Sequence, residues 1–257
     1  MNGTIEIGFS QRVRLEWLEH TADLVLAGRQ RGDIKSSLEE MLRDQLSVGS
    51  NPERGNRDKA VTILLRSWVS VPKSLEPLRN DALALLQRLP SEERLAVHWG
   101  MAMAAYPFFG AVAETAGRLL RLQGSVAAPQ VQRRIREQLG ERETVARAAR
   151  RVLRSFVDWG VLRDTEVKGR YEGVATRPVR DRVLARWLVE ATLLAGGTGT
   201  GVLAGLVGSP ALFPFDLQVH TAMELDRSPR LEFLRQGLDQ EVVILRRAIT
   251  SAPRSTS

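Results

Sequence analysis

The chain has 257 residues, 43% of them hydrophobic, and carries a formal net charge of +7. This length and composition exclude a disordered or fibrous chain and are typical of one large or two small domains with a buried core. The absence of cysteine excludes disulfides, thiolate metal sites and a cysteine nucleophile, and agrees with a cytoplasmic location.

The region 1–124 predicts a bundle of α-helices. Apolar residues recur at intervals of three and four, and glycine or proline ends most of these runs. Helices are predicted at 11–27, 57–70, 76–89 and 108–123. Two further helices are predicted to begin at a capping Asp33 and at Ser91. Proline cannot continue helical hydrogen bonding, so a kink or break is expected at Tyr106-Pro107. Residues 49–55 are expected to form a polar loop.

Residues 125–195 predict a helix, a turn and a second helix. Val131, Ile135 and Leu139 lie four apart on the first helix, and Gly140 is expected to stop it. The second helix carries an apolar stripe made of Val145, Ala148, Ala149, Val152, Phe156 and Val157. A separate stripe of arginines follows the same spacing on another side, and consists of Arg147, Arg150, Arg151 and Arg154.

Two short strand-like runs follow this helix, around Lys168-Gly169, and predict a β-hairpin. The order helix, turn, helix and hairpin is that of the winged helix, in which the second helix enters the DNA major groove and the hairpin lies on the phosphate backbone. Residues 129–182 hold 14 basic and 8 acidic side chains, a net charge of +6. Nearly all of the excess positive charge therefore falls in this region, which indicates a phosphate-binding surface.

We expect double-stranded DNA to be bound by seven side chains of this region. The arginine stripe would reach phosphates or guanine edges, while the helix start and the hairpin would contact the backbone. The predicted DNA-binding residues are Arg142, Arg147, Arg150, Arg151, Arg154, Lys168 and Arg170. Two alternatives stay open, because arginines on a helix often form only a solvated face and winged helices also bind proteins: an adaptor or scaffold of a complex, or a transcriptional regulator.

After a helix expected at 180–194, residues 196–257 predict a glycine-rich connection and a small mixed segment. Gly199-Thr200-Gly201-Val202-Leu203-Ala204 fits the dinucleotide pattern G-x-G-x-x-A, but a helical run precedes it and Pro210 follows, so we interpret it as a connection. Residues 217–225 are expected to be helical, and 231–246 either a helix with a strand at 241–245 or a hairpin around Gly237. Residues 251–257 are expected to form a loose tail.

No catalytic, cofactor or metal site is predicted. The three histidines His20, His98 and His220 are far apart and lack metal-ligand spacing, and His98 is expected to be a hydrogen-bonded core residue. The first nine residues do not resemble a signal peptide. Two uncharged stretches, 95–113 and 191–215, are long enough to cross a bilayer, but their glycine, proline and polar content favours buried helices, and no membrane partner is expected.

The string Val152-Leu153-Arg154-Ser155-Phe156-Val157-Asp158-Trp159-Gly160-Val161-Leu162, with Ile7-Gly8-Phe9-Ser10 and the helical body, resembles the BrxA-type proteins of BREX phage-exclusion systems over residues 5–195. This resemblance implies a non-catalytic DNA-binding protein that works beside other components of bacterial phage defence. The predicted fold class is mainly α: an N-terminal helical bundle (1–124), a winged helix-turn-helix with a short β-hairpin and a following helix (125–195), and a small mixed C-terminal segment (196–257).

Overall fold

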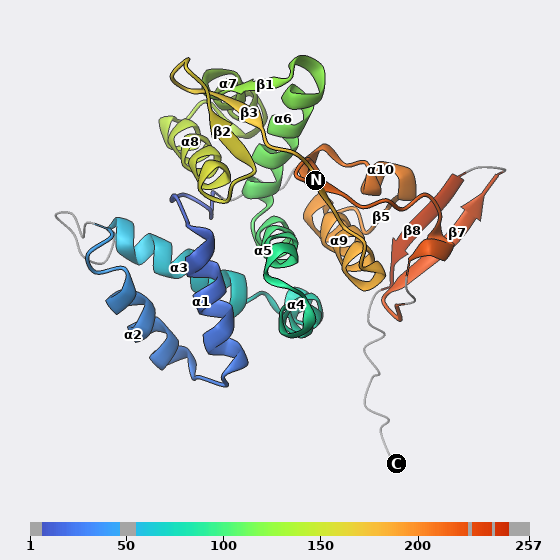
Figure 1. Ribbon diagram of the computed structural model, residues 1–257, viewed down its shortest axis with the longest axis horizontal. Coiled ribbons are helices and arrows are strands. Elements are labelled where there is room, and N and C mark those ends of the chain that lie inside the picture. Colours follow the sequence, from blue (N-terminus) through green and yellow to red (C-terminus); the bar gives the residue numbers. More distant parts are fainter. Residues whose placement is uncertain (1–6, 47–54, 226–227, 238–239, 247–257) are drawn as a thin grey trace, which may run out of the picture.

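A computed structural model describes residues 7–46, 55–225, 228–237 and 240–246, where the protein is mainly helical with three small sheets (Figure 1). The α-helices are α1 (Leu15–Leu26), α2 (Arg31–Met41), α3 (Asn56–Trp68), α4 (Glu76–Arg88), α5 (Ser91–Ala105), α6 (Pro107–Gln123), α7 (Ala128–Leu139), α8 (Glu143–Asp158), α9 (Arg182–Gly196) and α10 (Leu203–Val207). The strands are β1 (Ser125–Ala127), β2 (Leu162–Asp164), β3 (Arg170–Gly173), β4 (Arg177–Pro178), β5 (Thr200–Val202), β6 (Phe215–Asp216), β7 (Leu231–Gln236) and β8 (Gln240–Leu245). Short 3-10 turns are η2 (Lys73–Leu75), η3 (Pro210–Leu212) and η4 (Ala222–Glu224).

Helix α5 lies at the centre of the fold. Each of its residues from Leu95 to Ala105 is buried, as expected for a helix that is apolar on all sides. Helix α9 packs closely against it at Gly100, where an added Cβ would lie 2.3 Å from the ring of Trp187. A glycine in the middle of α5 therefore sets the approach of two core helices.

The predicted helices at 57–70, 76–89 and 108–123 are confirmed as α3, α4 and α6, with ends shifted by at most two residues. The predicted start of the first helix at Gln11 is wrong, because α1 begins at Leu15. Residues before it are held by tertiary hydrogen bonds: Gln11 Nε2 donates to Asn56 Oδ1 at 3.0 Å, and the Val13 amide donates to Ser155 Oγ at 2.9 Å.

The predicted cap at Asp33 is also wrong. Helix α2 begins at Arg31 with Gln30 as its N-cap residue, and Asp33 lies in the first turn. A carboxylate there is still favourable, because it faces the positive end of the helix dipole. The loop predicted at 49–55 lies outside the described residues except for Gly55, and the tail predicted at 251–257 lies wholly outside them.

The predicted break at Tyr106-Pro107 is confirmed. The helical path bends there by 118° between α5 and α6. Among the described residues, no single helix is long and apolar enough to cross a membrane. Helices α5 and α6 reach that length and apolar composition only when they are taken together.

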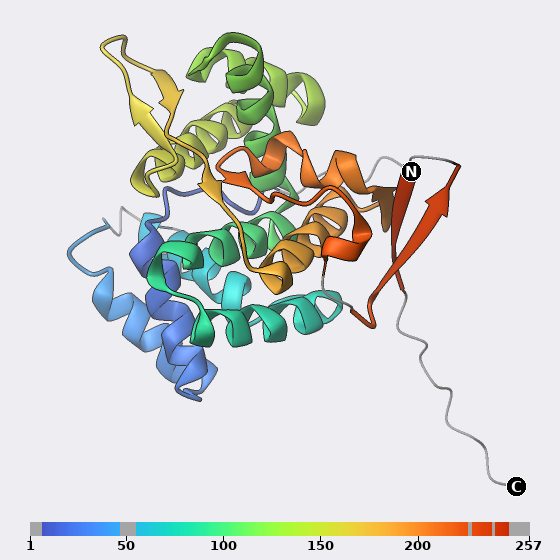
Figure 2. The same cartoon turned by 45° about the vertical axis from the view of Figure 1, so that its right-hand side comes forward.

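The helix pair and the hairpin predicted after residue 125 are confirmed as elements α7, α8, β2 and β3. Gly140 follows α7 with φ +102° and Gly169 lies in the hairpin turn with φ +80°, conformations that favour glycine. The strands form an antiparallel sheet in the order β1-β3-β2. Strand β1 was not predicted, because three residues are too few to show a period. In Figures 1 and 2 the β2–β3 hairpin projects from the helical body.

An aromatic cluster joins the three regions of the chain. The ring of Trp99 on α5 lies within 5.9 Å, centre to centre, of rings from α6, α8 and the segment after α10. These rings belong to Phe109, Phe156, Trp159, Phe213 and Phe215. The Trp99 Nε1–H also donates to the carbonyl oxygen of Ala211 at 2.9 Å. Buried residues of all three regions belong to one hydrophobic core.

The C-terminal segment is mostly extended. Of the two interpretations of 231–246, the hairpin is confirmed: β7 pairs with β8, β8 pairs with β5, and Gly237 has φ +71°. The helix predicted at 217–225 is wrong, since only the single turn η4 forms there. Gln218 has φ +49°, and its backbone N–H donates to Asp216 Oδ1, so a local turn replaces the helix.

Candidate nucleic-acid interface

One side of α8 is buried and the other faces solvent, as the two stripes in the sequence predicted. Val145, Val152 and Phe156 are fully buried, whereas Arg147 and Arg150 are exposed. Glu143 and Arg154 lie on the same ridge, since positions i, i+4, i+7 and i+11 lie along one face of a helix; Glu143 is exposed and Arg154 is half-buried. The N-terminal half of α8 therefore presents solvent-exposed charged side chains.

The C-terminal half of the same face is occupied by contacts within the protein. Arg151 Nη1 donates to the carbonyl oxygen of Ser10 at 2.8 Å, and Arg154 Nη1 donates to both carboxylate oxygens of Asp164, at 2.7 and 2.9 Å. Burial lowers the pKa of Arg151, and Arg147 and Arg150 lower it further. The hydrogen bond with Asp164 raises the pKa of Arg154 despite partial burial. Two of the four stripe arginines thus form hydrogen bonds within the protein, and Arg147 forms a longer ion pair with Glu143 at 3.9 Å.

The segment just before α1 lies against the end of α8. The Val13 amide donates to Ser155 Oγ, and Trp159 Nε1 donates to the Val13 carbonyl at 2.8 Å. Arg12 forms an ion pair with Asp158 through two nitrogens. These contacts join residues about 140 positions apart, and no local pattern in the sequence could have indicated them.

The remaining predicted site residues lie at the helix start and on the hairpin. Arg142 is the N-cap residue of α8, and Lys168 and Arg170 lie in and after the hairpin turn; all three are exposed. Within the described part of the chain none of them forms an ion pair. The hairpin is not uniformly basic, because Arg163 pairs with Glu172 at 2.9 Å and Glu166 is also exposed.

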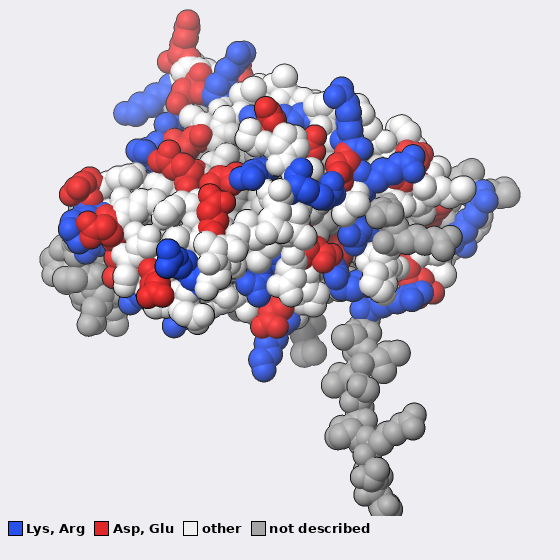
Figure 3. All heavy atoms as spheres, turned by 60° about the horizontal axis from the view of Figure 1, so that its bottom comes forward, with Lys and Arg blue, Asp and Glu red and all other residues white. Residues whose placement is uncertain are grey.

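Basic and acidic side chains are mixed on the rest of the surface as well. On the face that Figure 3 shows, basic and acidic side chains alternate over the described residues. Short-range ion pairs occur in and just after α2, where Lys35 pairs with Glu39 and Arg43 with Glu40. Charges arranged in this way largely cancel beyond a Debye length of about 8 Å.

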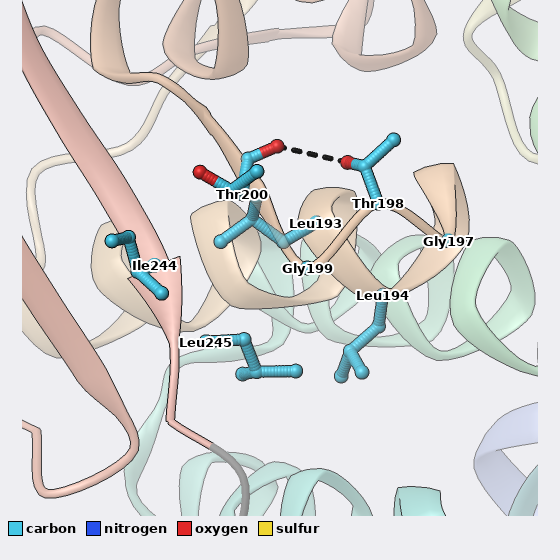
Figure 4. A pocket seen from close by; sticks show the side chains of 8 residues that line it. All are labelled: Leu193, Leu194, Gly197, Thr198, Gly199, Thr200, Ile244 and Leu245. Carbon is cyan, nitrogen blue, oxygen red and sulfur yellow. Dashed lines mark hydrogen bonds between the residues drawn. The ribbon is translucent and has the colours of Figure 1, made fainter.

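The glycine-rich segment borders a different site, an open pocket of about 550 Å³. It is lined by Leu193, Leu194, Gly197, Thr198, Gly199, Thr200, Ile244 and Leu245, none of which is charged (Figure 4). A dinucleotide site needs a parallel strand followed by a long helix whose N-terminus faces the pyrophosphate. Here β5 pairs antiparallel with β8, and α10 has five residues. The geometry does not fit a pyrophosphate.

His98 is fully buried, as predicted, and its Nε2 lies 3.2 Å from Glu19 Oε1, which is within hydrogen-bond distance. The ring also packs edge-on against Trp68, with centres 5.1 Å apart. In the described ranges, no group of three or more His, Cys, Asp and Glu side chains could hold a metal ion.

Compared with protein-family models, with curated proteins and with solved structures, the chain matches none.

Proposed function

We propose that this is a non-catalytic protein that binds double-stranded DNA through a winged helix-turn-helix formed by α6, β1, α7, α8, β2 and β3. One observation carries the proposal: a three-helix unit closed by a β1-β3-β2 sheet presents Arg147 and Arg150 outward from its last helix. An α-helix fits the major groove, and a hairpin beside it reaches the flanking backbone.

The distribution of exposed cations supports the same proposal. Lys168 and Arg170 on the hairpin and Arg142 at the start of α8 flank the open arginines, and each is free to neutralise a phosphate. Backbone contacts of this kind give affinity through counterion release but little sequence information. The acidic groups of the hairpin reduce the local field, so we expect modest affinity that depends strongly on salt.

The resemblance to BrxA-type proteins, carried by residues 152–162, extends the proposal to a role in bacterial phage defence beside other components of such a system. A DNA-binding subunit without its own chemistry suits a multi-component system in which other subunits act on the bound DNA.

Binding of a labelled duplex of about 25 base pairs, measured by fluorescence anisotropy between ~50 and ~200 mM salt, tests the proposal. Lys168→Ala with Arg170→Ala should lower the slope of log K against log salt by roughly 2, since each phosphate contact contributes about 0.9. Arg29→Ala with Arg43→Ala removes the same charge from exposed positions near α2 and should leave the slope unchanged. Equal effects of the two pairs, or no duplex binding by the natural chain, would refute DNA binding through this unit.

A protein adaptor is the second candidate, and one observation favours it. Leu122 is 76% exposed at the end of α6 and Val174 is 42% exposed after β3. Val174 also lines a pocket of about 380 Å³ together with Phe213 and Phe215. Apolar side chains around such a pocket suit a partner protein. Stable co-purification with a neighbour, lost in Leu122→Ser with Val174→Ser while duplex binding is absent, would favour the adaptor.

A further inference from the structure

The open half of α8 carries opposite charges on one ridge. Glu143 and Arg147 are 72% and 57% exposed at their side chains, and the shortest distance between their charged groups is 3.9 Å. This is a weak pair that a ligand can replace without loss of a strong bond. Arg150 lies on the same ridge and makes no ion pair with any described residue. Among the charged side chains of α8, these three are the ones without a strong partner elsewhere in the described part of the chain.

From this placement we infer that α8 reads G·C base pairs, with Arg147 and Arg150 donating to guanine and Glu143 accepting from the amino group of cytosine. The inference rests on the proposed function. Arginine binds guanine O6 and N7 through two hydrogen bonds, and a carboxylate accepts from cytosine N4. The ligand is therefore a duplex with G·C pairs at neighbouring positions.

The spacing of the ridge suits adjacent base pairs. Four residues of α-helix rise roughly 6 Å, and base pairs stack about 3.4 Å apart. Glu143 and Arg147 thus lie one to two base-pair steps apart along the groove. A carboxylate that approaches DNA is repelled by phosphates unless it accepts a hydrogen bond, so Glu143 favours sequences that supply the cytosine amino group.

The internal contacts of the C-terminal half of α8 limit base reading to the N-terminal half. Arg151 is held by the Ser10 carbonyl, Arg154 by Asp164, and Asp158 by Arg12. These contacts occupy the charged groups of the C-terminal half of α8 and link it to the segment before α1 and to β2. Arg151 and Arg154 are accordingly positioning residues in this arrangement, and base reading falls to the N-terminal half.

Selection of bound duplexes from a pool with a randomised core tests the inference. The natural chain should enrich G·C pairs at two or three neighbouring positions. Arg147→Gln should change the preference at one position from guanine to adenine, because glutamine pairs with adenine in the same geometry. Glu143→Gln should reduce the preference for cytosine at a neighbouring position by about 10- to 100-fold.

Glu39→Gln serves as the matched control, because it removes one exposed carboxylate and one ion pair from α2; it should leave the selected sequence unchanged. Thermal melting checks that each variant folds. Salt-dependent duplex binding without base preference, or with a preference that Glu143→Gln and Arg147→Gln leave unaltered, would overturn the inference while leaving the proposed function intact. Absence of duplex binding in the natural chain would overturn both.

Discussion

At the scale of single residues, the arginines of α8 differ in what holds them. The sequence predicts one side of the helix for a stripe of four arginines, and their spacing gives no reason to expect different partners. These are Arg147, Arg150, Arg151 and Arg154. The structure separates them, because Ser10 and Asp164 lie next to the last two and not the first two. A helical pattern predicts the direction of a side chain; its partner depends on the chain packed against it.

Replacing Asp164 with Asn should tighten duplex binding. The change removes a negative charge beside the proposed interface and weakens the pairing of Arg154 with residue 164, whose carboxylate is 55% exposed. One unit charge at close range in water is worth about 1 kcal/mol, or roughly fivefold in Kd, and this gain should shrink as salt rises. Anisotropy titrations at two salt concentrations measure it.

Glu39→Gln is the matched change for this experiment too, since it removes a carboxylate and its pairing with Lys35 from α2. Equal tightening by both variants would show a general effect of net charge, and weaker binding by Asp164→Asn would show that Asp164 positions Arg154 for DNA. Either result would contradict the expected role of Asp164 as a local negative charge.

At the scale of elements, helices with full apolar stripes and the hairpin marked by Lys168-Gly169 could be predicted from the sequence, whereas short strands that pair only with distant segments could not. The periodicity behind α3, α4, α6, α7 and α8 spans several turns, so it fixes both type and position. Strands β1 and β5 have three residues each and owe their conformation to partners far along the chain. The start of α1 was misplaced for the same reason, because Ser155 and Trp159 hold Val13 in place.

The start of α9 shows two roles in one side chain. Asp181 Oδ1 accepts from the Leu184 amide at 2.8 Å, and the same carboxylate binds both Nη atoms of Arg88 at 2.6 and 2.8 Å. Asp181→Asn keeps the cap and loses the ion pair, so it should cost less than about 1 kcal/mol. Asp181→Ala also loses the cap and should cost about 1 kcal/mol more. Urea denaturation at neutral pH measures both.

The pH dependence of this site has a definite sign. The hydrogen bonds from Arg88 hold the pKa of Asp181 below its usual value, so folding favours the charged form. Its contribution to stability is present above the unfolded pKa of about 3.9 and is lost as pH falls through the lower folded pKa. The difference between the natural chain and Asp181→Asn should therefore disappear in acid. A constant difference down to about pH 2 would contradict an ionic origin.

At the scale of the whole molecule, a network of four charges binds the C-terminal segment to the helical body. Arg230 Nε donates to Glu190 Oε1 at 2.7 Å and its Nη2 to Asp81, while Arg186 lies 3.7 Å from Glu190 and 3.8 Å from Asp81. Burial alone would lower the pKa of Arg230, but its hydrogen bonds to Glu190 and Asp81 outweigh burial and raise it. Two positive and two negative groups balance in a mostly buried site between α4, α9 and the start of β7.

Removal of one member of this network should destabilise the protein by leaving a buried charge uncompensated. Arg230→Met keeps the apolar volume but leaves Asp81 and Glu190 with Arg186 alone, and Glu190 is only 2% exposed at its side chain. Loss of one partner of a buried ion pair typically costs 3–5 kcal/mol, and the remaining Arg186 argues for the lower end, about 3 kcal/mol. Guanidinium denaturation measures the loss. Hydrogen exchange should show weakened protection in β7 and β8.

The double variant Arg230→Met with Glu190→Gln separates charge imbalance from lost packing. It leaves Asp81 and Arg186 as one balanced pair, so the double variant should be more stable than Arg230→Met alone. Lost packing would instead make the two changes additive, because no charge would have been left unpaired. A double variant less stable than Arg230→Met would therefore show that shape, and not electrostatic balance, holds the C-terminal segment on α4 and α9.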